Sequence, residues 1–174
     1  MLDRNLVFRY VSRRFNSLGV LYDHLHHSDA HGEGSVEEYL TDLISSEIHL
    51  FPNGERVKIH TALQECTCST KTLSSLGLIT NELVTNAMKY AFRDHQDPEL
   101  IMQGTRRDSR YTLTIQDNGP GIPGPDIDQS SGFGLMMIKA LTEQLDGTIR
   151  FQNDGGTQAT LEFPVEGNGC CLDC

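Results

Sequence analysis

The chain lacks the features of a membrane-spanning or nucleic-acid-binding protein. Its 174 residues contain no apolar run of about 18 residues, the length that a transmembrane helix requires. The first residues, MLDRN, lack the apolar stretch of a signal peptide, so we expect a cytoplasmic protein. Positive charge is scarce, because 14 Lys and Arg residues stand against 24 Asp and Glu residues, for a net charge of −10. This balance disfavours broad binding to DNA or RNA but allows one polyanionic ligand in a local pocket.

The five cysteines are unevenly placed. Cys66 and Cys68 form a C-x-C pair, and the other three, Cys170, Cys171 and Cys174, lie at the end of the chain. An odd count of five disfavours a disulfide framework, and a structural metal centre needs four ligands at suitable spacings. We therefore expect free thiols.

The length and the hydrophobic pattern indicate one α+β domain. Apolar residues at helical spacing predict a helix over 5–28, followed by a loop over 28–34. Ser35 then predicts an N-cap, with Glu38 three residues later in a capping box, at the start of a second helix. The remaining pattern predicts helices over 70–92 and 134–145, strands over 57–63, 99–105, 111–116, 148–152 and 158–163, and a Gly/Pro-rich loop over 118–132. Such a series favours a helical layer on one face of a mixed sheet.

The first chemically suggestive cluster is NELVTNAMKYA at 81–91. On a regular helix, Glu82, Asn86, Lys89 and Arg93 share one face. A solvated helix face could carry the same charges, but Asn86 is a poor helix former in this position and suggests a specific role. An amide oxygen, a carboxylate and an ammonium group together can hold a hydrated Mg²⁺ ion and a phosphate.

The second cluster is DNGPG at 117–121, directly after an apolar strand. Asp-Asn-Gly is ordinary turn chemistry, so a simple turn is one interpretation. The other interpretation is a binding site, in which Asp117 accepts a hydrogen bond from an exocyclic amine. Gly119 and Gly121 would then let the backbone approach a ligand closely.

The third cluster is SSGFGLMMI at 130–138, where a glycine-bearing loop leads directly into a helix. Unpaired N–H groups and the positive end of the dipole at a helix N-terminus suit a phosphate, although glycine there is also an ordinary cap. The spacing matches neither a Walker A motif nor a dinucleotide fingerprint.

Together and in this order, the clusters resemble the N box and the two glycine boxes of the GHKL superfamily, shared by sensor histidine kinases, gyrase-type ATPases, Hsp90 and MutL. The segments GGT at 155–157 and TLEFP at 160–164 match its closing strand region. The N box and the short loop over 122–131 resemble the short-lid class of bacterial sensor histidine kinases related to HWE kinases, although Asn81 stands where that group usually has histidine. The resemblance implies a two-layer α/β sandwich with a mostly antiparallel sheet covered on one face by helices, and the ATP-binding catalytic domain of a histidine kinase.

The resemblance also implies a role for each motif residue. Asn86 would bind Mg²⁺, directly or through water, and Glu82 would bind the water shell of the metal or act as the catalytic general base. Lys89 would meet the phosphates of ATP, and Tyr90 would flank the nucleotide. Asp117 would read the adenine amino group, supported by Thr157 through water. Close approach to the nucleotide and contacts with phosphate would involve Gly119, Gly121, Gly132, Phe133, Gly134 and Leu135, with 119–132 as a mobile lid.

Residues 14–29 resemble the end of the dimerisation hairpin of that class. We therefore expect residues 1–30 to be a remnant of its second helix, 31–164 to form the ATP-binding domain, and 165–174 to be a disordered tail. His24, His26 and His27 match the second helix of the hairpin, where surface positions are expected. The H-R-x-K-N-type context of a phosphoacceptor histidine is absent, so the chain resembles part of a longer protein.

The resemblance implies specific partners as well. The γ-phosphoryl group would pass to a histidine on a dimerisation domain and then to the receiver domain of a response regulator, in a homodimeric parent protein. Two alternatives stay open, an anti-sigma-factor-type serine kinase and a non-catalytic nucleotide-dependent interaction module.

Overall fold

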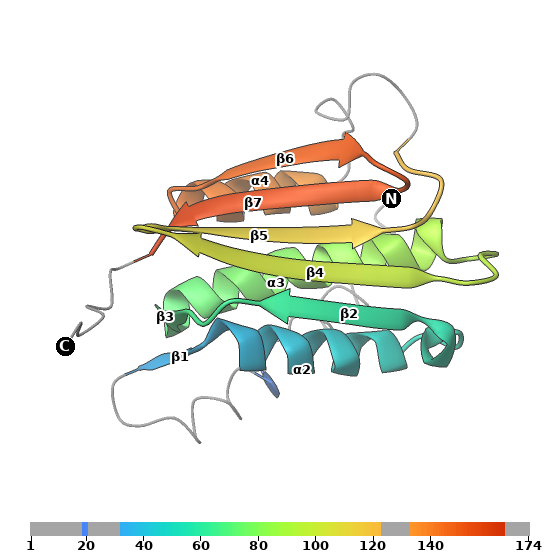
Figure 1. The fold of residues 1–174 in the computed structure, drawn as a ribbon, viewed down its shortest axis with the longest axis horizontal. Coiled ribbons are helices and arrows are strands. Elements are labelled where there is room, and N and C mark those ends of the chain that lie inside the picture. The colour runs from blue at the N-terminus through green and yellow to red at the C-terminus, as the bar shows by residue number, and fades with distance from the viewer. Residues whose placement is uncertain (1–18, 21–31, 123–132, 166–174) are drawn as a thin grey trace, which may run out of the picture.

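A computed structural model describes residues 19–20, 32–122 and 133–165. Its main sheet has five strands in the order β2-β4-β5-β7-β6 (Figure 1). Only β2 and β4 pair in parallel, and the other neighbours are antiparallel. The strand bounds are β2 Lys58–Leu63, β4 Glu99–Arg107, β5 Arg110–Asp117, β6 Thr148–Asn153 and β7 Thr157–Pro164. The five predicted strands are therefore confirmed; β2 begins one residue later than predicted, and the other four extend by one or two residues.

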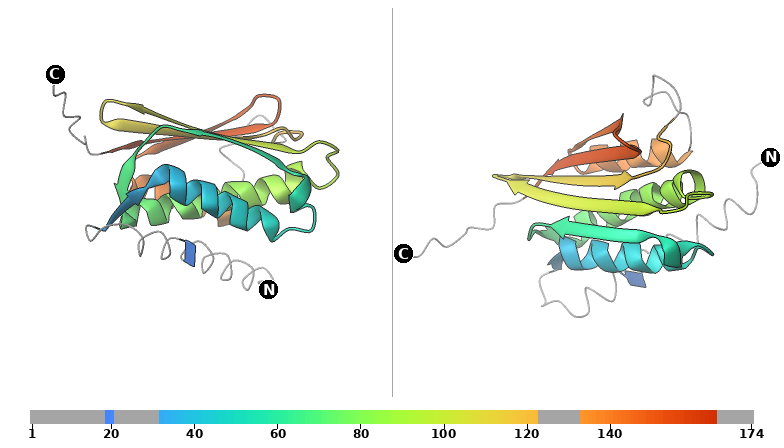
Figure 2. Two further views of the ribbon diagram at one scale, coloured as in Figure 1. Left: turned by 60° about the horizontal axis from the view of Figure 1, so that its bottom comes forward. Right: turned by 45° about the vertical axis from the view of Figure 1, so that its right-hand side comes forward.

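Three helices cover one face of this sheet, as Figure 2 shows in its left view. They are α2 Val36–His49, α3 Thr70–Asn86 and α4 Phe133–Gln144. Their apolar stripes pack with the inward-facing strand residues into one core. Tyr39 crosses α3 at Gly77, where any Cβ atom would overlap its hydroxyl group. The predicted α+β sandwich with one helical layer is confirmed.

A second, two-stranded sheet departs from the predicted loop over 28–34. It consists of β1, Glu33–Ser35, paired antiparallel with β3, Thr67–Ser69. The prediction failed here because three-residue strands are too short to show alternation. Val36 N donates to Cys66 O at 2.9 Å, so this small sheet ties together the starts of α2 and α3.

Side chains at the helix starts act as caps. Ser35 Oγ accepts from Glu38 N at 3.3 Å, as the predicted N-cap requires. Ser69 Oγ accepts from Thr72 N at 3.3 Å and caps α3 in the same way. These caps set the residue at which each helix begins.

The helix predicted over 70–92 changes its winding near its end. After Asn86 it continues as a π turn over Ala87–Ala91, and Phe92 N donates to Ala87 O at 2.9 Å. Because a π turn holds more residues than an α turn, the residues beyond it leave the face that ideal α spacing predicts. The helix ends with this turn, so Arg93 does not continue the face of Glu82 and Asn86 as predicted, while Lys89 lies within the turn.

Several predictions lie outside the described residues. Only Gly19 and Val20 of the first predicted helix are described, and both are helical. His24, His26, His27, Gly132 and the three terminal cysteines are among the residues not described. The division into 1–30, 31–164 and 165–174 stays a prediction.

Candidate functional site

Asp117 ends β5 and is 8% exposed. Its Oδ1 accepts two backbone hydrogen bonds, from Gly119 N at 2.9 Å and from Thr157 N at 3.0 Å. No hydrogen bond to Oδ2 joins it to another described residue, so that oxygen keeps its capacity to accept. Thr157 was expected to support Asp117 through water, whereas its backbone N–H contacts the carboxylate directly.

Two glycines bring the surrounding backbone against this strand end. A Cβ atom on Gly119 would lie 2.7 Å from Ala91 Cα, so the chain after Asp117 packs directly on the end of the π turn. A Cβ atom on Gly156 would overlap the carbonyl oxygen of Asp117. The sequence predicts that Gly119 lets a ligand approach closely. Among the described residues, Gly119 approaches the helix end at Ala91, and this contact joins the second motif to the first.

The side chain of Asn153, at the end of β6, anchors the segment that follows. Asn153 Oδ1 accepts from Ile122 N at 2.9 Å, and Asn153 Nδ2 donates to Ile122 O at 3.0 Å. Gly121 has a φ of +78°, and a Cβ atom there would lie 2.7 Å from Asn153 Oδ1. Gly121 is therefore required for this turn by both its conformation and its contact.

The N-box residues differ in exposure. Glu82 and Lys89 are half-buried, Asn86 is exposed, and Tyr90 is 74% exposed. Glu82 and Asn86 are one turn apart on α3 and precede the π turn, so their predicted common face is retained. An exposed tyrosine at this helix end has a ring free to cover a planar ligand.

The start of α4 meets this helix. A Cβ atom on Gly134 would lie 2.7 Å from Glu82 Oε2, which places the Glu82 carboxylate against the first turn of α4. The positive end of a helix dipole favours a carboxylate at this position. Phe133 is exposed, and Gly134 and Leu135 are half-buried. The structure thus brings the first and third motifs together, while Gly132 lies outside the described residues.

A buried polar cluster behind the motifs was missed by the sequence reasoning. Thr85 Oγ1 lies 3.5 Å from Glu47 Oε1 and 3.4 Å from Asn81 Oδ1. Glu47 is 1% exposed and projects from α2, while the other two residues belong to α3. The available signal was the place of Glu47 within the apolar stripe of α2, four residues after Leu43. A charged residue in phase with such a stripe indicates a buried partner.

The donor chemistry around Glu82 and Asn86 fits Mg²⁺. Both side chains offer hard oxygen atoms, and Mg²⁺ at phosphate sites is bound by one or two protein oxygens together with water and substrate. In the described part of the chain, no group of three or more His, Cys, Asp or Glu residues could hold a metal ion. A metal ion held by Glu82 and Asn86 would complete its coordination with water and with oxygen atoms of a bound ligand.

The family model for histidine kinase-, DNA gyrase B- and HSP90-like ATPases matches residues 72–167, more than half of the chain. The chain therefore belongs to this family of ATPases. Its fold is the GHKL type, and its structural neighbours are catalytic domains of sensor histidine kinases.

Among the relatives is the blue-light-activated histidine kinase 2 of Erythrobacter litoralis, 23% identical over 91% of this chain and 47% of its own length. The nitrate/nitrite sensor protein NarX of Escherichia coli is 30% identical over 51% of this chain and 14% of its own length. The chain thus spans about half or less of these curated relatives.

Solved structures share the fold. The histidine kinase domain of the Erythrobacter litoralis EL346 blue-light-activated kinase superposes with a TM-score of 0.78 and 22% identity, over 90% of this chain and 75% of that chain. The ATP-binding domain of PrrB from Mycobacterium tuberculosis gives a TM-score of 0.65 and 18% identity, over 80% and 100% of the two chains. Within the described residues, no helix is long and apolar enough to cross a membrane.

Proposed function

We propose that this chain is the catalytic domain of a sensor histidine kinase that binds ATP with Mg²⁺ and transfers the γ-phosphoryl group to a histidine. The observation that carries the proposal is the meeting of three motifs from distant parts of the chain. The Asp117 strand end packs on the end of the N-box helix through Gly119, and the start of α4 packs on the same helix through Glu82. The residues to which we assign base reading, metal binding and phosphate binding thus lie around one place.

Base recognition is assigned to Asp117. Its Oδ1 is held by Gly119 N and Thr157 N, which fixes the plane of the carboxylate and leaves Oδ2 as the acceptor. An acceptor in this position selects a purine with an exocyclic amino group, as in ATP. The exposed ring of Tyr90 flanks the nucleotide, and the turn through Gly119 and Gly121 forms the adjoining wall.

Phosphate and metal binding are assigned to the facing ends of α3 and α4. Asn86 and Glu82 would hold Mg²⁺ with the phosphate oxygens, and the metal ion would neutralise charge on the triphosphate. The backbone N–H groups of Phe133, Gly134 and Leu135 offer an anion site with the adjoining Gly132, and Lys89 adds a positive charge. The carboxylate of Glu82 now lies at this helix start. A bound phosphate therefore favours its movement toward the metal or the attacking histidine.

Glu82 is assigned the catalytic role of general base or water-shell ligand. Phosphoryl transfer depends mainly on positioning and charge neutralisation, so Glu82 acts on an already aligned histidine. The acceptor histidine would belong to a dimerisation domain, in the same or another chain, of a homodimeric parent protein. A response-regulator receiver domain would take the phosphoryl group next. Use of ATP favours a cytoplasmic position for this domain.

Phosphotransfer from γ-labelled ATP to a separately supplied dimerisation domain tests the proposal. We expect label on histidine, recognised because it is lost in acid and stable in base. Glu82→Gln should retain ATP binding and lower the transfer rate by about 10²-fold or more. Acid-stable label on serine would instead indicate the anti-sigma-factor kinase class. Tight ATP binding without any transfer would indicate a non-catalytic module.

A further inference from the structure

Two cysteines lie next to each other away from the nucleotide motifs. Cys66 directly precedes β3, and Cys68 lies within it. Their sulfur atoms are 3.7 Å apart, and both thiols are free. Cys66 is 2% exposed and Cys68 is 7% exposed. The two residues form a dithiol, in which we call the less exposed Cys66 the inner thiol and Cys68 the outer thiol.

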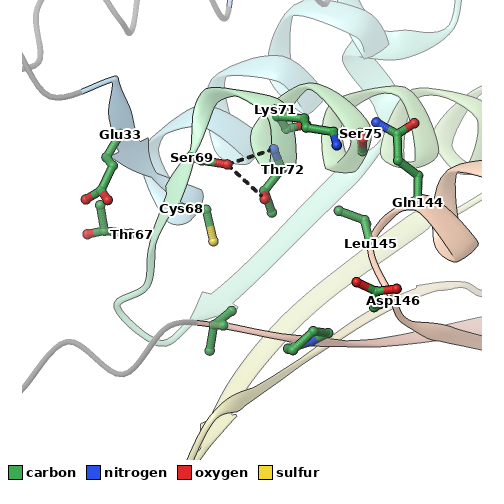
Figure 3. A pocket seen from close by; sticks show the side chains of 12 residues that line it. Glu33, Thr67, Cys68, Ser69, Lys71, Thr72, Ser75, Gln144, Leu145 and Asp146 are labelled. Atoms are coloured by element: carbon green, nitrogen blue, oxygen red, sulfur yellow. Dashed lines mark hydrogen bonds between the residues drawn. The ribbon is translucent and has the colours of Figure 1, made fainter.

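The outer thiol lines a cavity of about 560 Å³ between the start of α3 and the end of α4 (Figure 3). The lining is largely polar and includes Lys71, Ser69 and Thr72 from the start of α3 and Asp146 after α4. A space of this size can hold a small polar molecule beside Cys68, and its lining contains none of the residues of the three nucleotide motifs.

The two sulfurs differ in their readiness to lose a proton. The hydrogen bond from Cys68 lowers the pKa of the Cys66 thiol against the effect of burial, and the positive charge of Arg106 adds to this lowering. The same hydrogen bond, together with burial, raises the pKa of Cys68. When the pair has lost one proton, the thiolate is favoured on Cys66 and the remaining proton on Cys68. Cys68 therefore acts as a nucleophile from the less populated form, in which that proton has moved across the 3.7 Å contact to Cys66.

We propose that Cys68 is a thiolation site for low-molecular-weight disulfides, and that Cys66 resolves the adduct into a Cys66–Cys68 disulfide. Before the first step the pair loses one of its two protons to solvent, and the remaining proton lies on Cys66. In the first step the deprotonated Cys68 sulfur attacks one sulfur of the small disulfide, the S–S bond of the small molecule breaks, and one small thiolate leaves. In the second step the Cys66 sulfur attacks the Cys68 sulfur, its proton leaves to solvent, and the second small thiolate is released. The two protein thiols are oxidised and the small disulfide is reduced to two thiols.

The product is compatible with the backbone. Residues two apart in an extended segment have Cα atoms about 6.6 Å apart, within the range of about 4.4–6.8 Å for disulfides. The sulfurs must move from 3.7 Å to about 2 Å. That movement acts on β3, which pairs with β1, and on the Cys66 carbonyl that accepts from Val36 N at the start of α2. Oxidation is therefore expected to disturb the small sheet first.

Oxidised glutathione is the probe for a direct test by intact mass. The full chain with C170S, C171S and C174S keeps only the described pair. After incubation this protein should lose the mass of two hydrogen atoms. Adding C66S should trap one glutathionyl group on Cys68, and adding C68S instead should leave Cys66 unlabelled because Cys66 does not line the cavity. Reduction should restore the starting mass in each case.

Two results would overturn the proposal. One is an unchanged mass in the protein that retains both cysteines. The other is equal glutathionyl labelling of the C66S and C68S variants, which would show no distinction between an outer and an inner thiol. Because the first measurement leaves Cys66 and Cys68 intact, it does not depend on the folding of either serine variant. Peptide mapping of the oxidised protein locates the bond.

Discussion

Replacement of Asp117 by asparagine tests the nucleotide assignment most sharply. In the native protein Oδ1 accepts from Gly119 N and Thr157 N, and Oδ2 is the oxygen to which we assign the base. If the asparagine oxygen keeps the two backbone bonds, its NH₂ group faces the adenine amine, donor against donor. If the side chain flips, the NH₂ group faces two backbone N–H groups. Both orientations lose a charge-assisted hydrogen bond and oppose two donors.

The expected loss follows from these contacts. A hydrogen bond to a charged group contributes about 1.5–3 kcal/mol, and an unsatisfied buried donor costs about 1–3 kcal/mol. Together they predict ATP binding weaker by about a hundredfold or more. Isothermal titration calorimetry measures this directly. Asp154→Asn is a matched control, because it removes the same charge from an exposed position in the adjacent turn.

A second nucleotide distinguishes the loss of the proposed base contact from general damage to the fold. Inosine triphosphate carries a carbonyl oxygen where ATP carries the amino group, so it accepts where ATP donates. Asp117→Asn should therefore lose ATP affinity while its affinity for inosine triphosphate rises relative to the native protein. Unchanged ATP affinity, or parallel losses for both nucleotides in a folded variant, would refute the assignment of Oδ2 to the base.

Three further outcomes are expected. Asn86→Ala should weaken ATP binding in Mg²⁺ much more than in EDTA, and equal losses in the two titrations would remove Asn86 from the metal side. Gly156→Ala should destabilise the protein by about 3 kcal/mol in urea unfolding, because its Cβ atom overlaps Asp117 O. Gly155→Ala, which has open space but a φ of +63°, should cost only about 1–2 kcal/mol. Burial raises the pKa of Tyr111 in the folded protein, so stability should fall above about pH 10, where only the unfolded tyrosine ionises. Tyr111→Phe should flatten that alkaline decline, and an unchanged slope would contradict it.

The elements that the sequence predicted well are the long periodic ones. The stripe of α2 and the alternation of the five main strands repeat often enough to identify both type and face. The small sheet of β1 and β3 could not be predicted, because its identity depends on pairing between Glu33 and Ser69, distant in sequence. The π turn could not be predicted either, because the same residues are compatible with α or π winding and tertiary contacts decide between the two.

In the candidate site, too, local patterns could be predicted from the sequence and contacts between distant residues could not. Local motifs made Asp117, Glu82 and Asn86 candidates, and of these only Asn86 is unusual at its position. The direct bond from Thr157 N to Asp117 joins residues forty apart, and no local pattern carries it. The Glu47 cluster could have been predicted from the sequence, because the carboxylate of Glu47 lies within the apolar stripe of α2.

The π turn at the end of α3 can also change length in evolution without moving the helix before it. Deleting one residue within Ala87–Ala91 would convert the turn to α winding. The residues after the turn would keep their direction, because the lost residue and the tighter winding offset each other, and Glu82 and Asn86 would stay in place. Lys89 and Tyr90, which lie inside the turn, would change direction without any substitution. Length changes in this short segment therefore offer a route to altering the proposed phosphate and base contacts that leaves the residues proposed to bind the metal in place.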